Sequence, residues 1–382
     1  MHVGLGLTFQ NLNERVTDAD VFRHELDLAT RAEDMGFDSV WTPEHHFTGY
    51  MMTPNVPQFL AWVAGRTKRI QLGTTVTVLP WHDPVRVAES FIQLDHFSEG
   101  RALLGIGRGL GKDEFDGFRV PMGESRRRFR ECAEALLAAL ETGVVEYDGE
   151  FLKQPRVELR PRPYASYKSR VFASAVSPES VKLMANLNVG LMIIAQKPWD
   201  RVQEDLDSYR QRFKEVAGRP APKPVVVAFV AVNEDAAKAQ EMRDKYLVEY
   251  ARSTSSFYQF GNKEFASIDG YEYYGALARS VEKNGIEKFN SFLADLQIWG
   301  RPAEVLEKLH SMIERFDVGS FIIYTQFGDM PFEVGRANYE LFARKVLPNL
   351  KDIDVSVDGA PLLGSEPHPP FEVGGEVVIP AL

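Results

Sequence analysis

Short apolar runs alternate along this chain with longer stretches in which apolar residues recur at the period of a helix. This alternation is typical of repeated strand–helix units whose strands lie parallel in one sheet. We interpret eight of the apolar runs as strands, at residues 3–7, 37–42, 70–78, 102–106, 171–175, 191–194, 225–232 and 320–325. A closed barrel and an open, doubly wound sheet are both built from such units, so the count leaves both architectures open.

The segments between these runs carry helix and turn signals. We expect one helix to be capped at Thr17 and another to begin at Asp83 and Pro84. The stripe that the first helix would bury consists of Phe22, Leu26, Ala29 and Ala32. Asp148 and Gly149 lie between two short apolar runs and predict a small hairpin.

The glycine pattern favours the barrel. An open sheet that binds a dinucleotide should carry Gly-x-Gly-x-x-Gly directly after its first strand, where this chain has Thr-Phe-Gln-Asn at residues 8–11. Glycines at 105, 107, 109 and 111 have a different spacing and follow the fourth strand. We therefore predict an α/β fold, a (β/α)8 TIM barrel with an insertion between strands 7 and 8 and an extended C-terminal tail.

The long connection between strands 7 and 8 exceeds what a barrel needs. We predict a barrel over residues 1–350, with a lid-like insertion at about 250–292 that is rich in Ser, Gly, Phe and Tyr. The insertion would exclude water from the barrel mouth as a lid, and the alternative is an oligomer contact or plain elaboration of the fold. Residues 351–382 are rich in Pro and Gly and predict a surface extension without a core of its own.

Charge and cysteine content narrow the function classes. The chain has 54 acidic and 44 basic residues and a net charge of −10, which argues against nucleic-acid or membrane partners because both need a basic face. Its single cysteine, Cys132, cannot form an internal disulfide, and the N-terminus has no signal-peptide pattern. These features predict a cytoplasmic protein.

Titratable side chains gather behind the second strand. Glu44, His45 and His46 follow it directly, at the end of the barrel where catalytic residues collect. Adjacent residues at a strand end point in opposite directions, so we expect one of the two histidines to face the cavity. The other reading is a structural histidine pair. Thr74 and Thr75, in the third strand, lie at the same end of the predicted barrel.

A metal centre is the sharper alternative. Glu44, His45, His82 and Asp83 could supply ligands, but the first strand lacks the His-x-His of many metal-dependent barrel hydrolases. No spaced ligand set recurs later in the chain, so we expect no metal.

Several groups suited to an anion follow the fourth and fifth strands. Arg108 lies between two glycines, where a guanidinium can bind a phosphate with two hydrogen bonds. Arg126 belongs to a run of three arginines in the first turn of a helix, and a bound anion would offset their conflict with the helix dipole. Ser177 and Ser180 mark another helix start, which plain capping also explains. Together these signals predict one bound phosphate.

Three stretches match a known family: Trp-Thr-Pro-Glu-His-His-Phe at 41–47, Leu-Pro-Trp-His-Asp-Pro-Val-Arg at 79–86, and Phe-Ser-Glu-Gly-Arg at 97–101 running into Gly-Ile-Gly-Arg-Gly at 105–109. Through them the chain resembles the bacterial-luciferase-like flavin-dependent monooxygenases over roughly residues 1–350. The resemblance implies a (β/α)8 barrel in which reduced FMN and dioxygen form a flavin peroxide that oxygenates a small organic substrate. It also implies a separate flavin reductase that supplies the reduced FMN.

The resemblance also implies roles for individual residues. His45 would be the catalytic imidazole, with Glu44 and His46 beside it, and the residues assigned to the cofactor are Thr74, Thr75, Arg108, Arg126, Val176, Ser177 and Ser180. Thr74 and Thr75 fall where the family often has a non-prolyl cis peptide. Gly107 stands where the luciferase α chain has a reactive cysteine, so light emission is not implied.

Two other functions stay open at this point. One is hydride transfer with a deazaflavin, which the same family includes, and the other is a non-catalytic flavin-binding subunit. The aromatic insertion favours an apolar or aromatic substrate. The resemblance also suggests a homodimer in which helices after strands 2 and 3 pack across a two-fold axis, with the alternative that they only cover the barrel; their apolar faces are Phe59, Leu60, Val63, Val87, Phe91 and Leu94.

Overall fold

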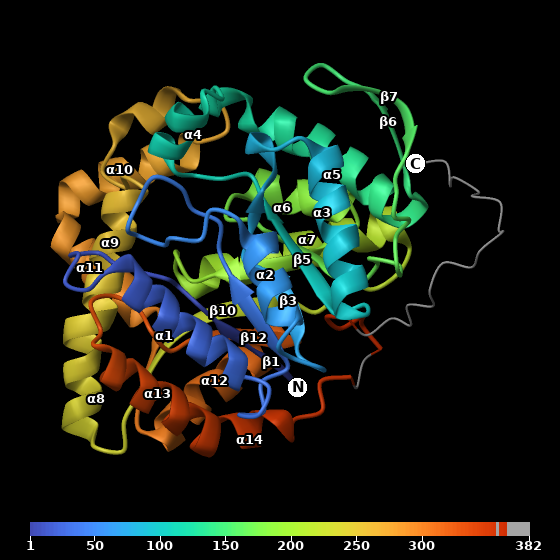
Figure 1. Cartoon of the computed structure of the whole chain (residues 1–382). Coiled ribbons are helices and arrows are strands. Elements are labelled where there is room, and N and C mark those ends of the chain that lie inside the picture. The colour runs from blue at the N-terminus through green and yellow to red at the C-terminus, as the bar shows by residue number, and fades with distance from the viewer. Residues whose placement is uncertain (357–358, 365–382) are drawn as a thin grey trace.

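The computed structural model describes residues 1–356 and 359–364 and confirms the barrel (Figure 1). In these residues, eight parallel strand positions close into a ring, and β12 pairs with both β10 and β1. The ring consists, in order, of β1 (His2–Gly6), β2 (Ser39–Thr42), β3 (Gln71–Thr74) continued by β4 (Thr77–Val78), β5 (Ala102–Gly107), β8 (Val171–Ser174), β9 (Gly190–Ile194), β10 (Val225–Val232) and β12 (Ser320–Tyr324).

Helices surround the ring and connect successive strands. They are α1 (Asp18–Arg31), α2 (Val56–Ala64), α3 (Pro84–Ser98), α4 (Lys112–Phe118), α5 (Ser125–Thr142), α6 (Pro178–Asn186), α7 (Trp199–Ala217), α12 (Pro302–Phe316), α13 (Phe332–Lys345) and α14 (Leu347–Lys351). The β6–β7 hairpin (Val144–Asp148 and Lys153–Glu158) projects from the barrel wall, as Asp148 and Gly149 predicted.

The third strand differs from the prediction of one run over residues 70–78. It breaks between β3 and β4, and the peptide bond from Thr75 to Val76 is cis. β3 pairs with both β2 and β5, whereas β4 pairs with β5 only. An apolar run shows that a segment is buried but does not show where its backbone departs from the ladder.

Alternating residues of the strands fill two different spaces. Val3 and Leu5 of β1 face the helices, where they join the larger apolar core. Gly6 faces the barrel interior, where an added Cβ atom would lie 2.4 Å from the ring of Tyr324. Aromatic rings such as Tyr324 and Trp41 therefore occupy the interior space that the glycines of β1 leave open.

The predicted helix starts are confirmed, but one buried face is not. Thr17 caps α1 through a capping box with Asp20, and the Asp83 carboxylate caps α3. The stripe predicted for α1 included Phe22 and Leu26, which are only half-buried. The fully buried residues of α1 are Val21, His24, Glu25, Leu28 and Ala29. Polar side chains lie in this interface because Thr8 and the amide of Phe9 donate hydrogen bonds to Glu25.

The segment between β10 and β12 forms a helical insertion. Its elements are α8 (Ala236–Met242), a π-helical turn (Arg243–Leu247), α9 (Val248–Phe257), a 3-10 turn (Lys263–Ser267), α10 (Glu272–Asn284), α11 (Ile286–Asp295) and β11 (Ile298–Gly300), which pairs with β10. Tyr258 and Tyr274 from this segment line the main cavity of the barrel. The insertion therefore forms part of the cavity wall.

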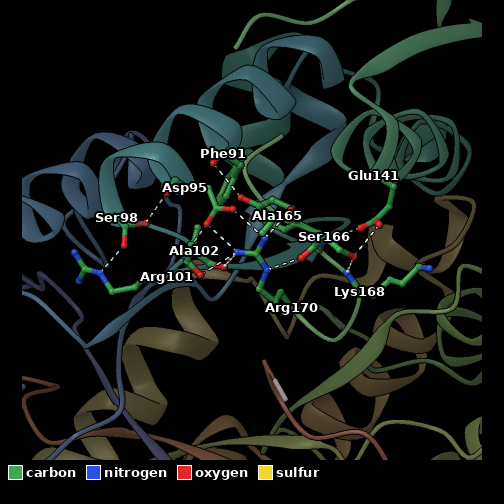
Figure 2. Close-up of polar contacts among 12 residues, drawn as sticks. Phe91, Asp95, Ser98, Arg101, Ala102, Glu141, Ala165, Ser166, Lys168 and Arg170 are labelled. Carbon is green, nitrogen blue, oxygen red and sulfur yellow. Dashed lines mark hydrogen bonds and ion pairs between the residues drawn. The ribbon is translucent and has the colours of Figure 1, made fainter. Parts of the chain in front are cut away.

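A buried ion pair links α3 to the segment before β8, near the amino ends of the barrel strands (Figure 2). The Arg170 guanidinium makes two hydrogen bonds to the Asp95 carboxylate, of 2.8 and 2.9 Å, and both side chains are almost fully buried. Arg170 also donates to backbone carbonyls of Gly100, Ala102 and Ala165. One guanidinium thus connects α3, the start of β5 and the segment before β8.

No helix of the described chain is long and apolar enough to cross a membrane. The part of the predicted C-terminal extension at residues 357–358 and 365–382 lies outside the described residues.

Candidate active site

The main cavity opens at the carboxyl ends of the barrel strands. Eight of the ten residues predicted for the site line it: Glu44, His45, Thr75, Arg108, Arg126, Val176, Ser177 and Ser180. Thr74 and His46 lie behind the wall. The Thr74 hydroxyl bonds to both the carbonyl and the amide of Gly105, so it serves the backbone of the barrel.

His45 is held from both sides of its ring. Its Nδ1 lies 3.1 Å from Glu114 Oε1, and its Nε2 lies 3.3 Å from the Tyr258 hydroxyl. The same Glu114 oxygen accepts the amide hydrogen of His46. In the tautomer in which Nδ1–H of His45 donates to this oxygen, the Nε2 lone pair faces Tyr258.

Tyr258 and the rings around it keep this imidazole away from bulk water. Burial raises the pKa of Tyr258 well above its usual value, so its hydroxyl keeps its proton and can donate to His45. The rings of Phe257 and Tyr50 contact the imidazole edge-on, at centroid distances of 4.9 and 5.2 Å. His45 is consequently only 8% exposed.

Glu44 joins two other histidines beside the cavity. Its Oε1 lies 2.9 Å from His46 Nε2 and 2.6 Å from His82 Nε2, and its Oε2 accepts the amide of Val78. Burial opposes ionisation of the Glu44 carboxyl, but the hydrogen bonds from His46, His82 and Val78 outweigh it and hold the pKa below its usual value. Burial lowers the pKa of His82, and the bond to Glu44 more than reverses this effect and raises it. Glu44 therefore acts as a fixed negative charge.

The cation end of the cavity is built from two guanidinium groups. Arg108 donates to the Gly270 carbonyl at 2.7 Å and Arg126 donates to the same oxygen at 3.4 Å. In the described part of the chain neither group lies within ion-pair distance of a carboxylate, and the buried Nε of Arg126 has no hydrogen-bond partner. Two cations that share one neutral carbonyl retain capacity for an anion.

The third part of the site is the start of α6. Ser177 caps this helix, accepts the amide of Ser180 at 3.3 Å, and lies 3.0 Å from the Ser180 hydroxyl. Both serines and Val176 border the cavity that Arg108 and Arg126 also line. The helix start and the two arginines therefore face one space, and these donors fit a phosphate.

The cis peptide lies between Thr75 and Val76, one residue later than the Thr74–Thr75 pair that the resemblance indicated. Both of its residues line the main cavity. The Thr75 hydroxyl lies 2.7 Å from that of Tyr324.

A smaller pocket continues from His45 into the barrel. Five aromatic rings line it, those of Tyr50, Phe229, Tyr250, Tyr258 and Tyr324. Phe229 stacks on Tyr250 and on Tyr324, at centroid distances of 3.7 and 4.7 Å. Among the residues that the structure describes, no Asp, Glu, Lys or Arg side chain lines this pocket.

The side chains considered as metal ligands do not form a metal site in the described chain. Within the described residues no group of three or more His, Cys, Asp or Glu side chains is arranged to hold a metal ion. Asp83, which the metal hypothesis used as a ligand, instead accepts the amides of Val85 and Arg86 as a helix cap.

The sequence patterns did not indicate Glu114 or Gly270, and they indicated Tyr258 only as one of the aromatic residues of the insertion, without a link to His45. Glu114 lies 69 positions from His45, and Tyr258 lies 213 positions from it. Glu114 lies in a short helix that follows the Arg108 motif directly. This closeness to Arg108 in the sequence was the one feature that could have pointed to Glu114. The insertion residues had no local signal beyond their aromatic composition.

Comparison with known proteins identifies the family. The sequence profile described as luciferase-like monooxygenase matches residues 1–317. The chain belongs to this family. Among curated relatives, this luciferase-like monooxygenase is 29% identical over 341 residues to the alkanal monooxygenase alpha chain of Photobacterium leiognathi, covering 87% of this chain and 94% of the relative.

Solved structures share the fold of this luciferase-like monooxygenase. The monooxygenase RslO1 from Streptomyces bottropensis has a TM-score of 0.72 and 26% identity, covering 92% of this chain and 100% of that one. The oxygenating constituent of 3,6-diketocamphane monooxygenase from Pseudomonas putida, in complex with FMN, has a TM-score of 0.70 and 18% identity, with coverage of 91% and 98%. The coenzyme F420-dependent tetrahydromethanopterin reductase from Methanopyrus kandleri has a TM-score of 0.63 and 19% identity, with coverage of 91% and 99%. The last two proteins share less than 25% identity with this chain, so these comparisons show similarity of fold only.

Proposed function

We propose that this protein binds reduced FMN and uses dioxygen to oxygenate a small, uncharged organic substrate. The observation that carries this proposal is the composition of one cavity. A helix start and two arginines that have no carboxylate partner within the described chain lie at one end, and a buried imidazole with an aromatic pocket lies at the other. This arrangement suits a cofactor with an anionic tail and a reactive ring.

Arg108, Arg126, Ser177, Ser180 and the backbone at Val176 would hold the FMN phosphate. When bound, the reduced flavin supplies the electrons that activate dioxygen. The chain carries no glycine fingerprint for a nicotinamide cofactor after its first strand, so a separate flavin reductase would supply the reduced FMN.

His45 would hold and move a proton at Nε2. Glu114 fixes the ring orientation from Nδ1, while Tyr258 and Phe257 exclude water from the same region. Glu44 would keep the loop that carries His45 and His46 in place through its bonds to His46, His82 and Val78.

The aromatic pocket beside His45 indicates the substrate class. Its walls offer ring faces and tyrosine hydroxyls but no full charge, so a flat apolar or aromatic compound with a carbonyl or hydroxyl group would fit, and a carboxylate would have no counter-ion. Hydroxylation and Baeyer-Villiger insertion need the same activated oxygen.

We also propose the cytoplasm as the compartment. Cys132 is buried, and burial raises the pKa of its thiol to about 11, so it is a packed, unreactive side chain. The net charge of −10 disfavours nucleic acid and anionic membranes as partners.

Oxygen uptake with chemically reduced FMN tests the proposed function. The protein should accelerate uptake and bind the reduced cofactor, and a suitable aromatic ketone or phenol should yield oxygenated product. Rapid hydride transfer to deazaflavin without oxygen uptake would instead identify the dehydrogenase alternative. Tight flavin binding with neither reaction would identify a non-catalytic subunit.

The substitution Arg108→Ala should weaken binding of reduced FMN by about 1.5–3 kcal/mol, the usual worth of a charge-assisted hydrogen bond. Riboflavin lacks the phosphate, so its affinity should be nearly unaffected. Arg119→Ala is the matched control, because this exposed arginine bonds only to a nearby carbonyl in the described chain. Anaerobic titration measures both affinities. An unchanged affinity for FMN would remove Arg108 from the site.

The residues predicted for the dimer face pack inside the chain. Phe59, Leu60, Val63, Val87, Phe91 and Leu94 are all less than 9% exposed, so they cover the barrel of their own chain. On the same pair of helices, Phe97 remains 58% exposed and Trp62 is half-buried. We propose that a homodimer would use this outer surface.

Light scattering should give twice the chain mass of 43.1 kDa. Phe97→Glu should shift the protein towards a monomer, because it places a charge in an apolar contact. Phe47→Glu is the control, since Phe47 is 70% exposed but lies on another segment. A parent protein that is monomeric at micromolar concentration would refute the dimer.

A further inference from the structure

A buried lysine lies behind the phosphate end of the cavity. The Lys197 amine donates to the Val176 carbonyl at 2.7 Å and forms an ion pair with Asp205 of α7. Lys197 is only 8% exposed, although it does not line the main cavity. A buried ammonium is costly even when it is paired, so this contact needs an explanation beyond surface charge.

Val176 separates two spaces. It lines the main cavity, and it also lines a small cavity that Lys197, Asp205 and Leu206 share on its other side. Lys197 therefore holds the Val176 carbonyl on the side away from the main cavity. The Val176–Ser177 peptide is trans, because neither of the two cis bonds in the described chain is at this position. In a planar trans peptide the carbonyl and the following amide point in opposite directions.

The amide of Ser177 consequently points towards the main cavity. In the described part of the chain this amide donates to no other group, although the Ser177 hydroxyl and carbonyl both have partners. It lies one residue before the first turn of α6, next to the space that Arg108 and Arg126 border. A directed, unpaired amide in this place is a donor for an anion.

We propose that Lys197, held by Asp205, is a positioning residue for the cofactor phosphate. It fixes the Val176–Ser177 peptide so that the Ser177 amide is presented to a phosphate monoester. This inference rests on the proposed function, since it assumes that the anion end of the cavity takes the phosphate of FMN. Lys197 acts through the backbone and does not touch the ligand.

The test is Lys197→Met, with Lys182→Met as the matched control. Lys182 lies exposed on α6, so its loss removes the same charge near the same helix without changing the bond to Val176. Anaerobic ultrafiltration would measure the affinity of each variant for reduced FMN and for reduced riboflavin. Lys197→Met should raise the Kd for FMN about fivefold to tenfold, less than the full loss of a charge-assisted hydrogen bond, because the Ser177 amide is misdirected and not removed. The Kd for riboflavin should change less than about twofold, and Lys182→Met should change neither.

A second variant controls for folding. Lys197→Met leaves Asp205 unpaired, so Lys197→Met/Asp205→Asn removes the residual charge and should show the same selective loss of FMN affinity. Equal weakening of FMN binding and riboflavin binding in both variants would mean a general structural role and would overturn the inference.

Arg108→Ala separates the two proposals. If Arg108→Ala abolishes the preference for FMN and Lys197→Met does not, only the role of Lys197 fails; if the parent shows no preference for FMN over riboflavin, the phosphate site itself fails.

Discussion

Replacing His45 with glutamine should leave FMN binding and oxygen consumption in place while product formation falls by roughly 100-fold, the lower range for loss of a general acid–base group. The imidazole accepts or donates a proton at Nε2, whereas a carboxamide only forms hydrogen bonds. The oxygen consumed by His45→Gln should therefore appear as free hydrogen peroxide. Parallel assays of oxygen, peroxide and product would measure this shift.

Three further variants locate the catalytic group. His96→Gln changes an exposed histidine on α3 that bonds only to the Arg162 carbonyl in the described chain, and it should behave as the parent does. Glu114→Gln should reproduce part of the His45→Gln effect, because an amide no longer specifies which nitrogen of His45 carries the proton. If His46→Gln uncoupled the reaction and His45→Gln did not, the assignment would move to His46.

The second large effect concerns stability. Arg170→Met should lower the free energy of unfolding by about 3–5 kcal/mol, because it leaves the buried Asp95 carboxylate without its counter-ion and removes the guanidinium hydrogen bonds to four backbone carbonyls. Equilibrium unfolding in urea measures the change. Lys168→Met, an exposed change nearby, should alter stability by less than about 0.5 kcal/mol.

The double variant Arg170→Met/Asp95→Leu should recover much of the lost stability, since it removes both charges together. FMN affinity should stay at the parental value in folded Arg170→Met, because the ion pair lies at the end of the barrel away from the site. A loss below about 1 kcal/mol would show that water or another group compensates Asp95.

The barrel could be predicted from the sequence because parallel strands in a barrel are buried on both sides and read as apolar runs. The break between β3 and β4 could not be predicted, since Thr75 and Val76 belong to an unbroken run of β-branched residues from 74 to 78 that is typical of a strand. The burial of Glu25 in α1 could not be predicted from the sequence either. Its partners, Thr8 and the amide of Phe9, come from the loop after β1, and a helical pattern says nothing about them.

The site was predictable where the strand ends alone define it. His45 and Arg108 follow β2 and β5 directly, so the topology brings them together. Thr74 was assigned to the cofactor along with Thr75, yet adjacent residues face opposite ways and only Thr75 reaches the cavity. Glu114 and Tyr258 reach His45 through tertiary packing of separate segments, which strand periodicity cannot register.

The Gly270 carbonyl contacts both arginines and would compete with a phosphate for the proposed anion site. This carbonyl already takes one hydrogen from each guanidinium, and at a φ of +83° residue 270 is suited to glycine. An incoming phosphate must share these donors with the carbonyl or displace it. The measured affinity for the phosphate would therefore be lower than the affinity of the two arginines in the absence of this competition. By reciprocity, a bound phosphate would weaken the hydrogen bonds from the two arginines to residue 270. Residue 270 belongs to the insertion, so the position of the insertion would depend on whether the cofactor is bound.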